Sequence, residues 1–339
     1  MAHGAESISN ASLSVRNSEF VDNYCYDRGC AVFLGYQPQN SNPDGIATSV
    51  VNNVFDSVNT RSLWVYHNTA PVNPVTLVQG NTFRNADFAG ESCCLFFVGG
   101  ASGAVTTFDA NDVADSGQLN IQYGESGKGE ISHVVTTISS STFRNTTPGY
   151  YPGGSFYDGS GGGASIDFGA ETASTTTSVT GSSFIGCAAA KGAPGGGLAI
   201  SFEGPTTASA TVTIDGVHFE NNTATGINGQ GGGMIVGVTG DTKVDGVGFA
   251  GFSFDTRRSA FVGNRASDVE GGGAIFINLP RDEPQNLRFT GDSDPAVWRN
   301  QSSGAGQNGD TGNPDDDEFN PVYPIPREFA PAAAAYASA

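Results

Sequence analysis

The stretch "SAFVGNRASDVEGGGAIFI", Ser259 to Ile277, decides the fold because it is one copy of a repeat. It joins a phenylalanine, an asparagine three places later, a polar loop, three glycines and an apolar run. The same order occurs at residues 217–237, at 182–202 and, with a longer loop, at 141–168. A nucleotide-binding glycine loop is normally used once, whereas a solenoid turn is used many times. The repetition therefore favours a solenoid and assigns the glycines to its corners.

One aromatic position, here called the anchor, recurs along the chain at spacings of 28 to 42 residues. The anchors are Phe20, Phe55, Phe83, Val113, Phe143, Phe184, Phe219 and Phe261. Five places earlier stand mostly apolar residues, namely Val15, Val50, Val78, Phe108, Ile138, Val179, Ile214 and Thr256. Two places earlier stand mostly Asn or Ser, namely Ser18, Asn53, Asn81, Asn111, Ser141, Ser182, Val217 and Ser259. This spacing has the wrong period for a helix and suits a strand that ends in a turn.

A parallel β-helix explains these columns, because it stacks equivalent residues of successive coils about 4.8 Å apart. Aromatic side chains then stack on aromatic side chains. Asn and Ser side chains can hydrogen-bond along the axis and satisfy polar groups that a bent coil would otherwise bury unpaired. We therefore predict one continuous column of anchors and one polar ladder beside it.

Each anchor is followed by a polar loop and a second apolar run, so each coil has at least two strands. The runs are "CAVFL" from Cys30, "SLWVY" from Ser62, "CCLFFV" from Cys93, "QLNIQY" from Gln118, "GASIDF" from Gly163, "GLAISF" from Gly197, "GMIVGV" from Gly233 and "GAIFIN" from Gly273. A last partial coil is expected around Trp298-Arg299-Asn300.

The predicted fold is all-β: a right-handed parallel β-helix, a solenoid of about eight to nine coils over residues 5–302. Residues 303–339 are rich in Pro, Gly, Asp and Ala and are expected to form a flexible tail or linker. An irregular β-propeller is the alternative fold, because spacings near 40 residues also suit propeller blades.

Composition limits the partners of the chain. With 34 acidic and 15 basic residues its net charge is −19, so it should repel nucleic acid and anionic membranes. No apolar stretch approaches the roughly 18 residues of a membrane helix, so no membrane insertion by this chain is expected. The start "MAHGAESISNASLSV" lacks the features of a signal peptide. Either such a signal was removed or the chain is a segment of a larger protein.

The five cysteines are too sparse for a disulfide-stabilised fold. The spacing of Cys25 and Cys30 allows a local bridge. No C-x-x-C is present and the four histidines are scattered, so no zinc site is expected.

The motif residues resemble a known family. Phe261 to Asn264 and Gly272-Gly273-Ala274-Ile275 match F-x-x-N and G-G-A-I, the two signatures of the polymorphic outer membrane protein repeat, within the pectin-lyase-like right-handed β-helices. Phe20 to Asn23 and Phe219 to Asn222 match the first signature, and Gly162-Gly163-Ala164 matches most of the second. The resemblance covers roughly residues 10–300 and implies a secreted, surface-displayed module used in adhesion.

The search for catalytic residues favours a protein that is not an enzyme. Pectin hydrolases of this fold carry N-T-D, D-D, G-H-G and R-I-K signatures, which the coils lack, and the adjacent acids Asp315 to Glu318 lie in the tail. For a lyase, the nearest cluster of a base and an acid is Asp255, Arg257 and Arg258, which also reads as a solvated turn. "GESGKGE" (124–130) and "GINGQGGG" (226–233) fail as phosphate loops, because neither is followed by the required helix. No catalytic, cofactor-binding or metal-binding residue is therefore assigned.

Two surface features leave alternatives open. Six places before the anchors stand mostly hydroxyl residues, which either bind an ordered surface such as ice or a crystalline glycan or simply fill an exposed strand face. They are Ser14, Ser49, Leu77, Thr107, Thr137, Ser178, Thr213 and Asp255. The sequons at Asn10, Asn145, Asn221 and Asn300 either carry glycans in a eukaryotic secretory pathway or come with the turn composition of the repeat.

The functional hypothesis is a non-enzymatic structural or adhesion module, extracellular or at a cell surface and part of a larger surface protein. Its expected partners are glycans or proteins of the cell surface or matrix. The alternative is a carbohydrate-active enzyme, either a polysaccharide lyase or a hydrolase.

Overall fold

The computed structural model describes residues 9–23, 30–36, 44–56, 61–67, 72–85, 94–98, 102–124, 131–148, 160–169, 174–190, 193–202, 209–225, 229–238, 251–267, 272–278, 285–289 and 299–302. Within these ranges the fold is all-β, without a helix. The whole predicted tail, residues 303–339, lies outside them, so its flexibility stays a prediction.

The strands form three sheets in which every described pair is parallel. The first sheet, in order, is β1 (Ser12–Arg16), β4 (Ala47–Val51), β7 (Val75–Gln79), β10 (Val105–Asp109), β13 (Val134–Ser139), β16 (Ser174–Thr180), β19 (Ser209–Asp215), β23 (Gly251–Arg257) and β26 (Gln285–Phe289). The second is β2 (Glu19–Val21), β5 (Val54–Asp56), β8 (Thr82–Arg84), β11 (Asp112–Ala114), β14 (Thr142–Arg144), β17 (Ser183–Ile185), β20 (His218–Glu220), β24 (Ala260–Ala266) and β21 (Thr223–Ala224), with β27 (Arg299–Ser302) paired to β24. The third is β25 (Ile275–Asn278), β22 (Met234–Val238), β18 (Leu198–Phe202), β15 (Ala164–Phe168), β12 (Leu119–Tyr123), β9 (Cys94–Val98), β6 (Arg61–His67) and β3 (Cys30–Tyr36).

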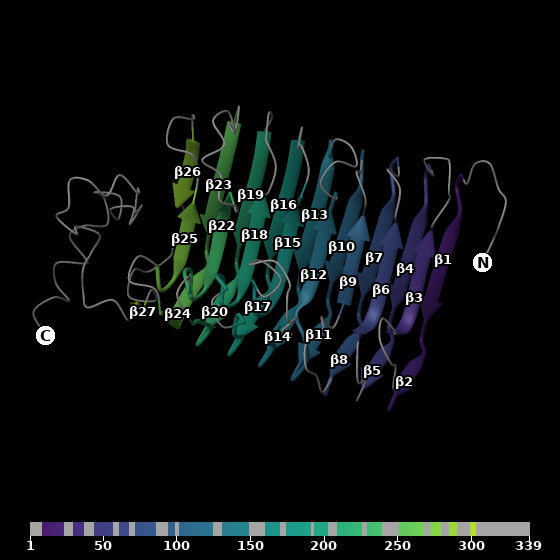
Figure 1. Ribbon diagram of the computed structural model, residues 1–339, viewed down its shortest axis with the longest axis horizontal. Coiled ribbons are helices and arrows are strands. Elements are labelled where there is room, and N and C mark those ends of the chain that lie inside the picture. Colours follow the sequence, from purple (N-terminus) through teal and green to yellow (C-terminus); the bar gives the residue numbers. More distant parts are fainter. Residues whose placement is uncertain are drawn as a thin grey trace, which may run out of the picture.

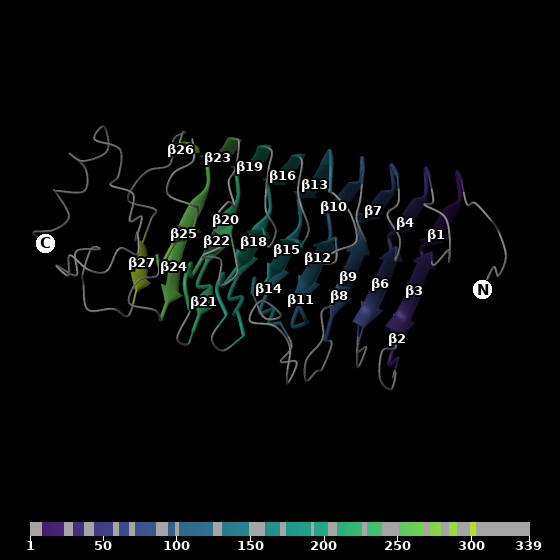
Figure 2. The ribbon, with the colours of Figure 1, turned by 45° about the horizontal axis from the view of Figure 1, so that its top comes forward.

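Sequence-distant strands are neighbours because the chain visits the three sheets in turn and then returns to the first. Successive repeats therefore lie side by side along the long axis, with the first repeats at one end and the last at the other (Figures 1 and 2). This arrangement is consistent with a parallel β-solenoid. A propeller is an antiparallel architecture, so the parallel pairing excludes that alternative.

The predicted anchor column is confirmed. The eight anchors occupy one register from Phe20↔Phe55 through to Phe219↔Phe261. Ring centroids of Phe143 and Phe184 lie 4.7 Å apart and those of Phe184 and Phe219 lie 5.0 Å apart, and the ring planes are nearly parallel, at 3° and 6°. Stacking identical residues at the strand spacing thus forms a continuous aromatic spine inside the molecule.

The one anchor that is not aromatic has a compensating neighbour. Val113 leaves space between Phe83 and Phe143, and Phe108 of the first sheet fills it, with ring centroids 6.4 Å and 5.8 Å from those two rings. Phe108 is the only aromatic residue among the eight residues five places before the anchors. The exchange of a large and a small residue between the two columns therefore conserves core volume.

The predicted polar ladder is also confirmed. The Asn53 backbone N–H donates to Oδ1 of Asn81 at 2.9 Å, and the Asn81 N–H donates to Oδ1 of Asn111 at 2.9 Å. Serine continues the ladder, because the Asn111 N–H donates to Oγ of Ser141 at 3.1 Å. Each side chain thus accepts the backbone N–H of the preceding coil at a buried corner.

A second buried ladder explains the asparagine of F-x-x-N. Asn222 and Asn264 are fully buried, and the Asn222 N–H donates to Oδ1 of Asn264 at 3.0 Å. Nδ2 of Asn264 donates to the carbonyl of Phe219, the anchor of the preceding coil, at 3.0 Å. In the F-x-x-N motif, the phenylalanine therefore stacks on other aromatic rings. The asparagine makes hydrogen bonds to the backbone of the preceding coil where the chain turns.

The remaining predictions on the strands were correct in position but incomplete. All eight second apolar runs correspond to the third-sheet strands, and β27 pairs with β24 where the last partial coil was expected. The spacing was predicted to suit a strand that ends in a turn. The structure places the turn between the anchor and the residue five places before it, which lie in the second and first sheets, because the residue three places before the anchor has a left-handed backbone.

Candidate functional site

The outer side of the first sheet carries two columns of small hydroxyl and apolar side chains, here called the hydroxyl face. Adjacent strands align without a register shift from β1 to β19. One column is Ser12, Ala47, Val75, Val105, Val135, Thr176 and Thr211, and the other is Ser14, Ser49, Leu77, Thr107, Thr137, Ser178 and Thr213. The second column contains the first seven members of the predicted hydroxyl column in one continuous line, and the eighth, Asp255, follows Thr213 in register on β23.

Burial along each strand shows that these residues point outward. In β7, β10 and β13 they alternate with buried residues, and Val75 and Val135 are 44% and 37% exposed. The inward neighbours Thr76, Thr106 and Thr136 are buried. Period-two alternation therefore sets the face apart from the core.

The hydroxyl face contains no charged residue, in a chain with 49 charged side chains. It presents hydroxyl groups, which both donate and accept hydrogen bonds, between valine methyl groups. Neighbouring positions repeat about every 4.8 Å from strand to strand and about 7 Å along a strand. The strands stay nearly parallel along the row (Figures 1 and 2), as in sheets flattened by stacking and side-chain ladders. This is a regular, uncharged surface.

Polar side chains line one border of the hydroxyl face. The Asp109 carboxylate accepts hydrogen bonds from Nε2 of Gln79 at 2.9 Å and from Oγ of Ser139 at 2.7 Å. At the amino-terminal end, Arg16 donates to the hydroxyls of Ser14 and Ser49 at 2.8 Å and 3.3 Å. Side chains at this border are therefore joined by hydrogen bonds from one strand to the next.

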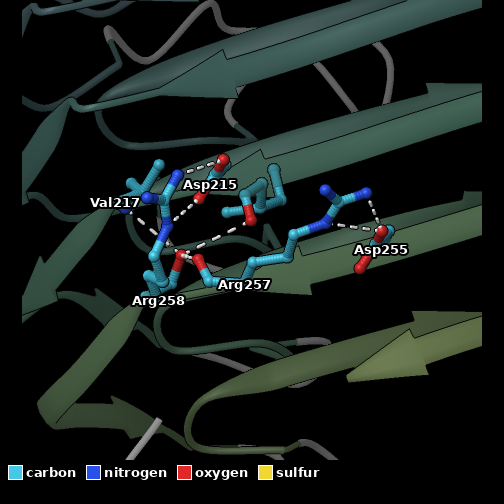
Figure 3. A network of polar contacts seen from close by, with 7 residues as sticks. Asp215, Val217, Asp255, Arg257 and Arg258 are labelled. Carbon is cyan, nitrogen blue, oxygen red and sulfur yellow. Dashed lines mark hydrogen bonds and ion pairs between the residues drawn. The ribbon is translucent and has the colours of Figure 1, made fainter. Parts of the chain in front are cut away.

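Charge enters at the carboxy-terminal end of the sheet, where Asp255, Arg257 and Arg258 had been considered as a catalytic cluster. Arg258 donates to both carboxylate oxygens of Asp215, at 2.9 Å and 2.6 Å, and Arg257 pairs with Asp255. Figure 3 shows the two guanidinium groups pointing in different directions, each toward its own carboxylate. The cluster is thus two separate ion pairs.

The ion pairs disfavour base chemistry. Hydrogen bonding to Arg258 lowers the pKa of Asp215, and hydrogen bonding to the two aspartates raises the pKa values of Arg257 and Arg258. An arginine whose pKa is raised keeps its proton, so neither can remove a proton from a sugar. Within the described ranges, no group of three or more His, Cys, Asp or Glu is placed to hold a metal ion.

The glycine triplets are corner residues, as predicted. The N–H of Gly163 donates to the Gly197 carbonyl at 2.8 Å, and the N–H of Gly197 donates to the Gly233 carbonyl at 2.9 Å. A Cβ on Gly196 would collide with the backbone oxygen of Gly232, so only glycine allows this approach. These N–H groups donate hydrogen bonds to the next coil. Residues 226–233 are followed by strand β22, whereas a phosphate site needs a helix at that point. Residues 125–130 of the other loop lie outside the described ranges.

Two of the described cysteines, Cys94 and Cys187, are buried. Burial raises the pKa of Cys187 to about 11, so this thiol keeps its proton at neutral pH. Cys25 lies outside the described residues, so its bridge to Cys30 stays a prediction. The described residues also include no helix long and apolar enough to cross a membrane.

The sequons lie at corners. Asn10, Asn145 and Asn221 are exposed and have positive φ values of 52°, 52° and 54°. The side chain of Asn300 is outside the described part of the structure. This left-handed conformation is one that Asn adopts more readily than most residues.

In comparisons with known proteins, no family model, no curated protein and no solved structure matches this chain.

Proposed function

We propose that the chain is a right-handed parallel β-helix of eight to nine coils, similar to the pectin-lyase-like proteins with polymorphic outer membrane protein repeats. Parallel strands joined within one sheet are connected with right-handed crossovers in about 98% of cases, which supports the hand. The motif residues support the likeness, because each has a place in the stack. Phe261 lies in the aromatic spine, Asn264 in the second ladder and Gly272 at a corner.

The same proposal makes the chain a non-enzymatic module, extracellular or at a cell surface, that adheres to a polysaccharide. The single observation that carries it is the hydroxyl face, an uncharged surface repeated in register over seven strands. An extended polysaccharide presents alternating hydroxyl groups and apolar C–H faces with a repeat of similar size to the coil spacing. Serine and threonine hydroxyls match the former, and Val75, Val105 and Val135 match the latter.

A carbohydrate-active enzyme has less support. Catalysis on a sugar needs acids and bases that converge on one point with perturbed pKa values. Arg257 and Arg258 are instead held in separate ion pairs. Rigid stacked coils with loops of variable length suit display and binding.

Retention on insoluble polysaccharides tests the proposal. The purified chain is incubated with cellulose, chitin and insoluble β-glucan and then sedimented. Thr137→Lys places an ammonium group in the middle of the hydroxyl face, where an unpaired buried charge costs several kcal/mol, so binding to the retained polymer should fall about tenfold or more. Thr142→Lys is the matched control, because it lies in the same repeat on the second sheet.

Retention on none of the polymers, or equal loss in both variants, would contradict adhesion through this face. New reducing ends or an unsaturated-sugar absorbance from a uronate polymer would favour the enzyme instead.

A further inference from the structure

The corner that follows each anchor holds two sequon asparagines in one column. Asn145 and Asn221 both stand two places after an anchor, both are exposed, and both have left-handed backbone. Backbone hydrogen bonds place Asn145, Gly186 and Asn221 at the same corner of three successive repeats, since the N–H groups of these residues donate to Ile185, Glu220 and Val262 in turn.

Each sequon begins with an exposed asparagine and continues into a buried residue. The middle residues, Thr146 and Asn222, are fully buried, whereas the acceptor asparagines are exposed and Thr147 is exposed. Asn222 belongs to the second ladder and cannot reach solvent. The corner therefore presents the first amide of each sequon and protects the second position.

Each acceptor side chain lies against a glycine of the next coil. In the next coil, the position equivalent to Asn145 is Gly186 and the position equivalent to Asn221 is Gly263. Neither glycine projects a side chain at the corner. A Cβ on Gly186 would lie 2.8 Å from Oδ1 of Asn145, and a Cβ on Gly263 would collide with Oδ1 of Asn221. Because Asn145 and Asn221 are themselves exposed, a glycan on either amide can leave the corner without displacing a core residue.

We propose that Asn145 and Asn221 are attachment sites for N-linked glycans when the chain is secreted by a eukaryotic cell. This inference rests on the extracellular location in the proposed function. The co-reactant is an oligosaccharide linked to a polyprenyl diphosphate. Nδ2 of the asparagine attacks the anomeric carbon, the N–C bond forms, the anomeric C–O bond breaks, and the polyprenyl diphosphate leaves while Nδ2 loses one proton.

The glycans and the hydroxyl face occupy different parts of the surface. The acceptors follow β14 and β20 of the second sheet, whereas the hydroxyl face belongs to the first sheet. Glycans at this corner therefore leave the hydroxyl face uncovered, and the two sites can be tested on one sample.

Asn85 is a matched control within the chain. It stands two places after Phe83, is exposed, has a φ of 53°, and donates from Nδ2 to Asp56 at 2.9 Å, much as Asn145 donates to Asp115 at 3.1 Å. It is followed by Ala86 and Asp87, so it is not a sequon. Asp87→Thr would create one in the same column.

The full chain is secreted from a cultured eukaryotic cell behind a cleavable leader. Sites are mapped by peptide mass spectrometry after enzymatic deglycosylation in heavy-oxygen water, which converts an occupied Asn to a labelled Asp. We expect label at Asn145 and Asn221 and none at Asn85. Thr147→Ala and Thr223→Ala should each remove one site, while Thr223→Ser should keep it and Asp87→Thr should add one at Asn85. These variants leave every asparagine with positive φ in place.

Secreted, folded chain with unlabelled Asn145 and Asn221 would overturn the inference. Polysaccharide retention of the same sample separates the two proposals. Unlabelled asparagines with retention intact contradict only the glycan sites, and labelled asparagines without retention contradict only the adhesive function.

Discussion

At the scale of single residues, the burial of His67 makes the stability of the fold depend on pH. Its side chain is buried in the inward column of the third sheet that also holds Tyr123, Phe168 and Phe202. Desolvation by burial lowers the pKa of His67 from 6.5 to about 4, so the folded chain holds it neutral. The unfolded chain binds a proton more readily between these two values. Stability from this residue is therefore complete above about pH 6.5 and is lost as the pH falls toward 4.

His67→Phe should remove this pH dependence, because phenylalanine already occupies the equivalent position in two later coils, at Phe168 and Phe202. The free energy of unfolding of the unmodified chain should fall, relative to the variant, by about 3 kcal/mol between pH 7 and pH 4. Urea unfolding at several pH values measures the difference. Parallel curves for the two proteins would show that His67 is not the cause.

At the scale of elements, the polar ladder joins one corner to the next. Asn81 lies between β7 and β8, and its Oδ1 accepts hydrogen bonds from both the backbone N–H and Nδ2 of buried Asn53. Asn81→Ala leaves those donors without that acceptor and should cost about 1–3 kcal/mol. Asn81→Ser should cost less, because the Oγ of Ser141 and the Oγ of Ser182 serve the same role in other coils. Urea unfolding compares the variants, and an equal loss in both would argue against a ladder.

At the scale of the whole molecule, a stacked fold makes stability depend on position along the axis. Phe184 is fully buried and stacks on Phe143 and Phe219, whereas Phe20 is partly buried in a terminal strand and stacks on Phe55 at 4.9 Å. Phe184→Ala should cost roughly 3–5 kcal/mol by leaving a cavity between two rings. Phe20→Ala should cost clearly less, since the end of a stack can relax.

Hydrogen exchange and urea unfolding together measure this difference. Phe184→Ala should increase exchange in the coils on both sides, and Phe20→Ala should increase it only near the first strands. Equal losses at the two positions would contradict a stack whose repeats interact mainly with their neighbours.

Much of this architecture was predictable because a solenoid stacks chemically similar residues of successive coils on one another. The anchors, the Asn and Ser column and the hydroxyl column each repeat one kind of residue, so a search for columns found them before any coordinates. The second ladder was missed, since its members Thr146, Cys187, Asn222 and Asn264 share little but a polar atom. The signal that points to it is the position three places after each anchor.

By itself, the sequence determined the parallel stacking, the aromatic spine, the first polar ladder and the glycine corners. In each of these columns a residue contacts a residue of the same kind in the next coil, so the repeat is visible in the sequence. Only the tertiary structure decided the corner between the first and second sheets. There Asn17, Gly80, Ala110, Ser140 and Arg258 all have positive φ, although Ala and Arg rarely adopt it. The left-handed backbone costs about 1–2 kcal/mol per residue. The N–H groups of Asn17, Ala110 and Ser140 donate hydrogen bonds to the next coil, which offset that cost, and such bonds exist only once the coils are stacked.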